Sequence, residues 1–160
     1  MDLSGRDTES VWDYPRPPRV EPTEELVVVA FAGTAIAETR HALRVLETSH
    51  PPVYYVPFEA VAPGVLTPAR RRSFCEWKGV AVYWTAASGG RRSVEAGWSY
   101  PEPSPGYEAL GDHVAFHPER VDGCFVDGEL VESQPGSFYG GWVTSRIWGP
   151  FKGAPGTAGW

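Results

Sequence analysis

The sequence predicts an all-β protein in which short antiparallel strands form two sheets. Apolar runs are short and end at turn residues, and Gly and Pro are frequent, with 18 and 16 of the 160 residues. Aromatic residues make up a further 13%. Short runs of β-branched and aromatic residues between turns are typical of sandwiches and barrels. We therefore expect about eight short strands in a two-sheet or half-open barrel arrangement, with almost no helix.

The chain divides into an arm over residues 1–22, a domain over 23–132 and a tail over 133–160. The arm is polar and contains four prolines, which exclude a helix or a central strand. It is expected to be extended and to be anchored on the domain by Trp12 and Tyr14.

The first strands of the domain form a hairpin. Residues 24–32 are rich in Val and are typical of a buried strand, Gly33-Thr34 is a turn signal, and residues 35–40 form the returning strand. Residues 41–48 fit either a short helix or another strand.

Prolines and glycines delimit the remaining elements. A strand over residues 53–56 ends at Pro57, and residues 58–61 allow one helical turn. The clearest strand of the middle of the chain follows Gly79. Later strands are expected over 91–100, 113–117 and 121–131, the last broken by the hairpin signal Asp127-Gly128. A loop over 101–111 holds at most one helical turn.

The tail is unusually aromatic. Seven glycines separate six large aromatic residues, namely Phe138, Tyr139, Trp142, Trp148, Phe151 and Trp160. So much apolar surface would be a liability in water. We expect it to pack as a structural wrap or a dimer seam, or to form a lid over a pocket.

The composition excludes several classes of partner. The net charge is −6 and the only basic run is Arg70-Arg71-Arg72, so no nucleic-acid footprint is expected. The longest apolar run, over residues 26–32, is too short to cross a bilayer, and the amino terminus lacks a signal-peptide profile, so a cytoplasmic protein is expected. Cys75 and Cys124 are then two free thiols.

Residues 73–84 gather the most reactive side chains. Cys75 becomes a nucleophile if Lys78 lowers the pKa of its thiol, or it is a small buried hydrophobe. Lysine is rare, with two against twelve arginines, so Lys78 and Lys152 stand out. If Lys78 shares a strand face with Val80, its amine points inward and requires a carboxylate partner.

Glu38 and Glu47 are the natural partners for Lys78. On a strand with period two, Glu38 lies on the same face as the apolar Ile36. The pair is either a salt bridge within the core or a ligand-facing pair suited to acid–base chemistry.

Aromatic residues surround these groups in the sequence. They are either core residues or the walls of a pocket for a planar ligand: Tyr54, Tyr55, Trp77, Tyr83, Trp98 and Tyr100. His113 and His117 are about 13 Å apart if they lie on one strand, so they cannot share a metal. No metal site and no cofactor are expected.

Several motifs together resemble the bacterial and fungal domain-of-unknown-function family 427. They are Ala37-Glu38, residues 46–57 with His50-Pro51-Pro52, residues 75–79 (Cys-Glu-Trp-Lys-Gly), residues 81–84, residues 98–101 and residues 114–116. Residues 140–144 and 149–153 resemble an extension of actinobacterial members. The resemblance implies a β-tent, or Mss4-like, fold. Many β-tent proteins hold zinc through paired C-x-x-C motifs, which this sequence lacks, so no structural zinc is expected.

The resemblance leaves the function open. A nucleotidyltransferase label used for the family finds no support, because neither a D-x-D spacing nor a P-loop is present. We expect a pocket for a small organic ligand and an acid–base enzyme with Glu47 or Glu38 as base, Lys78 as charge partner, Tyr55 as hydrogen-bond donor and Cys75 as an optional nucleophile. The alternatives are a non-catalytic binding module, as in cereblon-like relatives, and an assembly domain, in a monomer or a homodimer.

Overall fold

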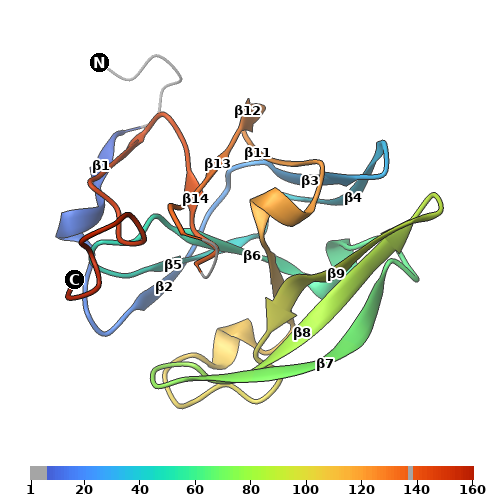
Figure 1. Ribbon diagram of the computed structural model, residues 1–160, viewed down its shortest axis with the longest axis horizontal. Coiled ribbons are helices and arrows are strands. Elements are labelled where there is room, and N and C mark those ends of the chain that lie inside the picture. The colour runs from blue at the N-terminus through green and yellow to red at the C-terminus, as the bar shows by residue number, and fades with distance from the viewer. Residues whose placement is uncertain (1–6, 137–138) are drawn as a thin grey trace.

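The computed structural model describes residues 7–136 and 139–160, and their fold is all-β, as predicted (Figure 1). The larger sheet has seven strands in the order β2 (Arg19–Pro22), β5 (Leu43–Leu46), β6 (Val53–Pro57), β10 (His113–Phe116), β9 (Arg91–Ser99), β8 (Gly79–Ser88) and β7 (Leu66–Cys75). The second has the order β12 (Glu129–Leu130), β11 (Gly123–Val126), β3 (Val27–Phe31) and β4 (Thr34–Thr39). All neighbours within these two sheets are antiparallel.

Two short ribbons and single helical turns complete the described structure. β1 (Glu9–Ser10) pairs in parallel with β15 (Ile147–Trp148), and β13 (Glu132–Ser133) pairs with β14 (Trp142–Val143). The helical turns are η1 (Val11–Asp13), η2 (Phe58–Ala60), η3 (Glu108–Leu110) and η4 (Pro118–Arg120). Residues 41–48 thus contain the strand β5, one of the two structures expected there. No helix within the described ranges is long and apolar enough to cross a membrane.

Tight turns follow the glycine signals closely. Asp127 and Gly128 both have positive φ, at 49° and 84°, as a two-residue hairpin turn between twisted strands requires. Gly89 and Gly90 turn β8 into β9 in the same way. The first hairpin turns at Ala32-Gly33, one residue earlier than the sequence indicates.

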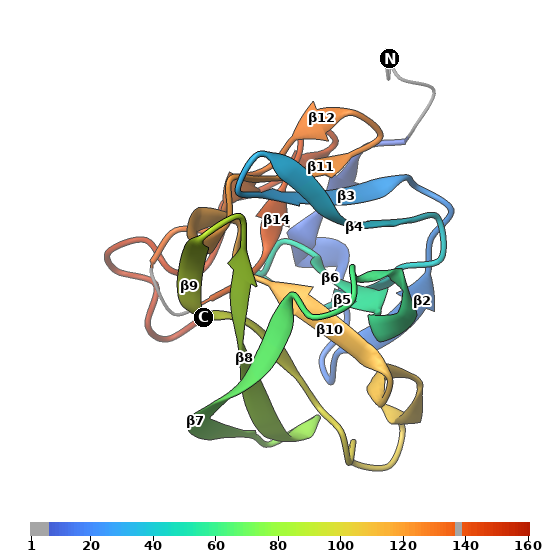
Figure 2. The ribbon, with the colours of Figure 1, turned by 90° about the vertical axis from the view of Figure 1, so that its right-hand side faces the viewer.

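The seven-stranded sheet buries side chains on both of its faces. On one face Tyr54, Val56 and Phe116 join the main core with residues of β3 and β11. Figure 2 shows β3, β4, β11 and β12 above β6 and β10. On the other face Tyr55 and Trp98 belong to a second apolar cluster. Because neighbouring residues of a strand point to opposite faces, Tyr54 and Tyr55 serve different clusters.

The tail packs on the body of the same chain. Trp142 is fully buried, its ring stacks on Tyr54 at a centroid distance of 5.0 Å, and its Nε1–H donates to the carbonyl of Phe116 at 3.1 Å. β15 lies against the arm (Figure 1). The described tail therefore packs on its own chain, and the wrap, the lid and the dimer seam remain predictions. Phe138 lies outside the described residues.

The arm is also more integrated than expected. Trp12 donates its Nε1–H to the carbonyl of Pro150 at 2.9 Å, and Tyr14 is buried. η1 adds one helical turn, and β2 is an edge strand of the seven-stranded sheet. An edge strand tolerates Pro because one of its sides needs no backbone donor.

A buried ion network links the arm to the sheet. Arg44 is 2% exposed, and its guanidinium donates to both carboxylate oxygens of Glu9 at 3.1 Å and to Glu21 at 2.6 Å. Arg146 of the tail donates to Glu9 at 2.8 Å. Burial alone would raise the pKa of Glu9, but hydrogen bonds from Arg44 and Tyr14 and the charges of Arg44 and Arg146 lower it below its usual value.

Candidate functional site

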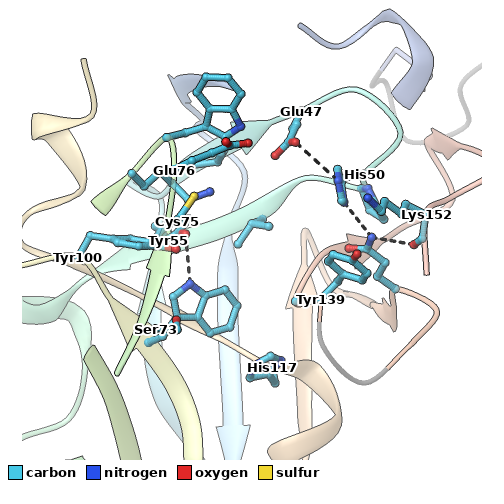
Figure 3. Close-up of a pocket in the computed structure, with 18 of the residues that line it drawn as sticks. Glu47, His50, Tyr55, Ser73, Cys75, Glu76, Tyr100, His117, Tyr139 and Lys152 are labelled. Atoms are coloured by element: carbon cyan, nitrogen blue, oxygen red, sulfur yellow. Dashed lines mark hydrogen bonds and ion pairs between the residues drawn. The ribbon is translucent and has the colours of Figure 1, made fainter. Parts of the chain in front are cut away.

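A pocket of about 630 Å³ opens on the second face of the seven-stranded sheet (Figure 3). Its volume lies in the range of small-molecule sites. Sheet strands, the β7–β8 hairpin and the tail supply the lining: Val45, Glu47, His50, Pro51, Val53, Tyr55, Ser73, Phe74, Cys75, Glu76, Trp77, Lys78, Tyr83, Trp98, Tyr100, His117, Gln134, Tyr139, Gly140 and Lys152.

Aromatic residues of neighbouring strands form the floor. Tyr55 and Trp98 lie edge to face at 6.3 Å, and Trp98 Nε1–H donates to the Tyr55 hydroxyl at 3.3 Å. The Tyr83 hydroxyl shares a hydrogen bond with Ser73 at 2.9 Å, and Tyr100 lies beside Tyr55. Burial raises the pKa of Tyr55 well above its ordinary value. Tyr55 therefore keeps its proton and remains a hydrogen-bond donor.

The β7–β8 hairpin supplies the reactive groups singled out in the sequence. Cys75 ends β7 and is half-buried, and Trp77 and Lys78 lie in the turn before Gly79. The ammonium of Lys78 lies 5.6 Å from the centre of the Tyr100 ring. Lys78 was predicted to share the inward face of this strand with Val80. That prediction was wrong, because Val80 is 51% exposed and the pocket face of β8 carries Ala81 and Tyr83 instead. Lys78 reaches the pocket from the turn rather than from the strand.

Glu47 lies beside a histidine whose orientation the tail controls. Glu47 Oε2 is 3.7 Å from His50 Nε2 and 3.5 Å from Arg16 Nε. The buried Gln134 accepts the Gly141 N–H through Oε1, so its amide nitrogen donates to the Lys152 carbonyl at 2.8 Å and to His50 Nδ1 at 3.1 Å. A neutral His50 then carries its proton on Nε2, facing Glu47 (Figure 3).

His50 and His117 are both neutral near pH 7. Burial, together with the charges of Lys152, Arg16 and Lys78, lowers the pKa of His50 to about 4. Burial, together with the charges of Arg120 and Arg71, lowers the pKa of His117 to about 4. The His117 ring packs 4.6 Å from that of Trp98, and its buried Nδ1 has no partner within the described part of the chain.

Most of the residues proposed from the sequence line this pocket. They are Glu47, Tyr55, Cys75, Trp77, Lys78, Tyr83, Trp98 and Tyr100. The expected Glu47–Lys78 ion pair is not formed, because Glu47 pairs with Arg16 and Lys78 lies over Tyr100.

Two proposed residues lie elsewhere. Tyr54 faces the main core and donates its hydroxyl to Glu25 at 2.8 Å. Glu38 is exposed on β4, because the register jumps from Val29↔Ala37 to Ala30↔Ala35 and leaves Ile36 in a bulge. Ile36 and Ala37 both point inward there, so the alternation that placed Glu38 on the buried face fails.

Sequence reasoning missed one wall of the pocket. His50, His117, Gln134, Tyr139 and Lys152 come from the loop before β6, the end of β10 and the tail. Lys152 carried a signal as one of the two lysines in an arginine-rich chain, and Tyr139 as one of the tail aromatics for which a lid was an alternative. His50 stood in a family motif without a role, and Gln134 carried no signal. Within residues 7–136 and 139–160, no group of three or more His, Cys, Asp or Glu side chains could hold a metal ion.

Acidification is expected to weaken the fold through the two neutral histidines. Between the ordinary histidine pKa of 6.5 and the folded value of about 4, only the unfolded state binds the proton, so the free energy of unfolding falls as the pH falls. From pH 7 to pH 5 the loss is about 2 kcal/mol per histidine, at 1.36 kcal/mol per pKa unit. Urea denaturation at both pH values measures it.

Substitution assigns this effect to each histidine. His50→Gln and His117→Gln should each flatten the dependence, whereas replacing the exposed His41 by Gln should leave it unchanged. Equal stability of the wild type at pH 5 and pH 7 would contradict the prediction.

Comparison with known protein families identifies the family of this chain, a family described as a domain of unknown function. A model of the family described as domain of unknown function 427 (DUF427) matches residues 19–127, which is more than half of the chain. No curated protein matches significantly. The matched range begins at β2 and ends in the turn after β11, so it includes the sheet face that forms the pocket floor. The chain therefore belongs to the DUF427 family.

Proposed function

We propose that the protein is an enzyme that acts on a small organic molecule by general acid–base chemistry in this pocket. The observation that carries the proposal is the arrangement of Glu47. Its carboxylate is 23% exposed, borders the pocket and lies beside a neutral histidine whose proton is directed toward it. A carboxylate positioned in this way can accept a proton from a bound substrate.

Each neighbouring group has a role in this scheme. Glu47 accepts a proton from the substrate, and the Tyr55 hydroxyl donates a hydrogen bond to a substrate oxygen on which negative charge develops. The ammonium of Lys78 stabilises the same charge from above Tyr100. Cys75 lines the pocket as well, but the scheme assigns no step to its thiol.

The aromatic floor favours a second candidate function, a non-catalytic binding module for a planar ligand. Among the aromatic side chains of the lining, Tyr55, Tyr83, Trp98 and Tyr100 are at most 9% exposed, so the surfaces most open for stacking are those of the exposed Phe74 and the half-buried Trp77. The β-tent resemblance is consistent with either function, because its fold relatives include both enzymes and ligand-binding domains.

Turnover by a Glu47 variant separates the two functions. The wild type is incubated with a defined library of small aromatic and carbonyl-containing metabolites, and products are followed by mass spectrometry. Glu47→Gln should reduce the rate about 100-fold or more, the usual contribution of a general base, with little change in substrate affinity. Glu38→Gln is the matched control, since this carboxylate is exposed on β4 and should leave the rate unchanged.

Two outcomes would oppose the catalytic proposal. Full turnover by Glu47→Gln would remove Glu47 from the chemistry. Binding of library members by the wild type without any product would favour the binding module.

A further inference from the structure

Both lysines of the chain line the pocket. Lys78 extends from the β7–β8 turn over Tyr100, and Lys152 extends from the tail over Tyr139, at 5.6 and 5.9 Å from the ring centres. Within the described ranges, neither ammonium lies within 4.0 Å of a carboxylate. Two ammonium groups without carboxylate partners in one pocket are available to bind an anionic group of a ligand.

The surroundings of His50 show which sign of charge this side of the pocket favours. The carboxylate of Glu47 is closest to His50, but it is already paired with Arg16. The charges of Lys152, Arg16 and Lys78 all disfavour protonation of His50. Glu76, the other acidic lining residue, is exposed to water. The balance near His50 therefore favours a negative group.

The other end of the pocket requires a hydrogen-bond partner. Figure 3 shows His117 on the opposite side of the view from Glu47. His117 is 7% exposed, and its buried Nδ1 has no partner within the described structure. A buried polar atom without a partner costs free energy, and because the His117 side chain lines the pocket, its imidazole is the polar group that this end offers to a ligand.

We propose that the ligand of this pocket is a planar, ring-containing organic acid. Its anionic group lies between Lys78 and Lys152, its ring packs on the aromatic residues that line the pocket, and a hydroxyl, carbonyl or ring nitrogen at its far end hydrogen-bonds to His117. This inference names the substrate class for the site of the proposed function and rests on that pocket being the ligand site.

Paired probes test the charge requirement directly. 4-Hydroxybenzoate and 4-hydroxybenzamide have the same ring and hydroxyl but differ in charge, as do indole-3-acetate and indole-3-acetamide. Dissociation constants are measured by quenching of tryptophan fluorescence, with ligand-detected NMR for weak binders. In each pair the acid should bind about tenfold more tightly than the amide.

Variants assign the preference to the residues named. Lys78→Met and Lys152→Met keep the apolar stem of the side chain, and each should reduce the preference for the acid several-fold. Arg92→Met removes an exposed cation outside this pocket and should leave it unchanged. His117→Phe should weaken 4-hydroxybenzoate but not benzoate, which lacks the hydroxyl. Circular dichroism confirms that each variant is folded.

Three results would overturn the inference. They are equal or tighter binding of the amides, a preference for the acids that persists in both lysine variants, and no binding of either acid at millimolar concentration. The tests also separate this inference from the catalytic proposal. Acid-selective binding without turnover overturns only the catalysis, whereas turnover of a neutral substrate by an enzyme that does not prefer acids overturns only the ligand class.

Discussion

Trp142→Ala is expected to lose about 3–5 kcal/mol of the free energy of unfolding, the usual cost of truncating a fully buried tryptophan. The variant removes the stacking on Tyr54, leaves a cavity in the main core and leaves the Phe116 carbonyl without its indole donor. The tail would then be an obligatory part of the core, although it lies outside the range matched by the family.

Chemical denaturation at pH 7 measures the effect, and a second tail tryptophan provides the control. Trp148 is 62% exposed, so Trp148→Ala should change stability by no more than about 0.5 kcal/mol. If the Trp142 variant is as stable as the Trp148 variant, the tail does not contribute to the core in the way that the structure indicates.

The second large effect is expected at Arg44. Arg44→Ala should cost about 3 kcal/mol, because it removes the buried guanidinium that donates to Glu9 and Glu21, whose side chains are 28% and 34% exposed. Arg19 provides a matched control: its side chain is 58% exposed and pairs with the same Glu21 at 3.5 Å. Arg19→Ala should cost less than about 1 kcal/mol, as exposed ion pairs do.

A double variant tests the physical reason for the Arg44 effect. Adding Glu21→Gln to Arg44→Ala removes the carboxylate that is left with the exposed Arg19 as its cation, whereas Glu9 still pairs with Arg146, so this double variant should recover part of the lost stability. If the losses from Arg44→Ala and Arg19→Ala are equal, the burial of the guanidinium does not determine its contribution.

Local signals in the sequence predicted most strands and turns, but they missed the ten-residue strand β7, which begins at Leu66. The turns at Gly89-Gly90 and Asp127-Gly128 depend on positive φ at neighbouring residues, a requirement that glycine meets and that can be recognised without knowing the fold. The all-β class follows from the same short-range chemistry.

The phase of a strand relative to the core was harder to predict. In a sheet buried on both faces, adjacent tyrosines look alike in the sequence, yet Tyr54 enters the main core and Tyr55 enters the pocket. The bulge at Ile36 reverses the alternation of inward and outward side chains at Glu38. The bulge depends on how β4 pairs with β3, and the sequence of β4 alone does not reveal that pairing.

The rest of the candidate site depends on contacts between distant segments. Gln134 meets His50 across 84 residues, and His117 contacts the Trp98 ring from the end of another strand. Neither pair has a characteristic spacing in the sequence, because the tertiary packing of the tail and of β10 determines these distances.

The pocket has two parts with different positions in the chain. The aromatic floor lies within residues 19–127, which match the family, whereas Gln134, Tyr139, Gly140 and Lys152 belong to a wall contributed by the segment that follows. Substitution of Tyr139 or Lys152 would change the charge and shape of this wall, whereas any side chain at Gly140 would collide with the Trp98 ring of the floor. The tail therefore sets part of the charge and shape of the pocket although it lies outside the range that matches the family.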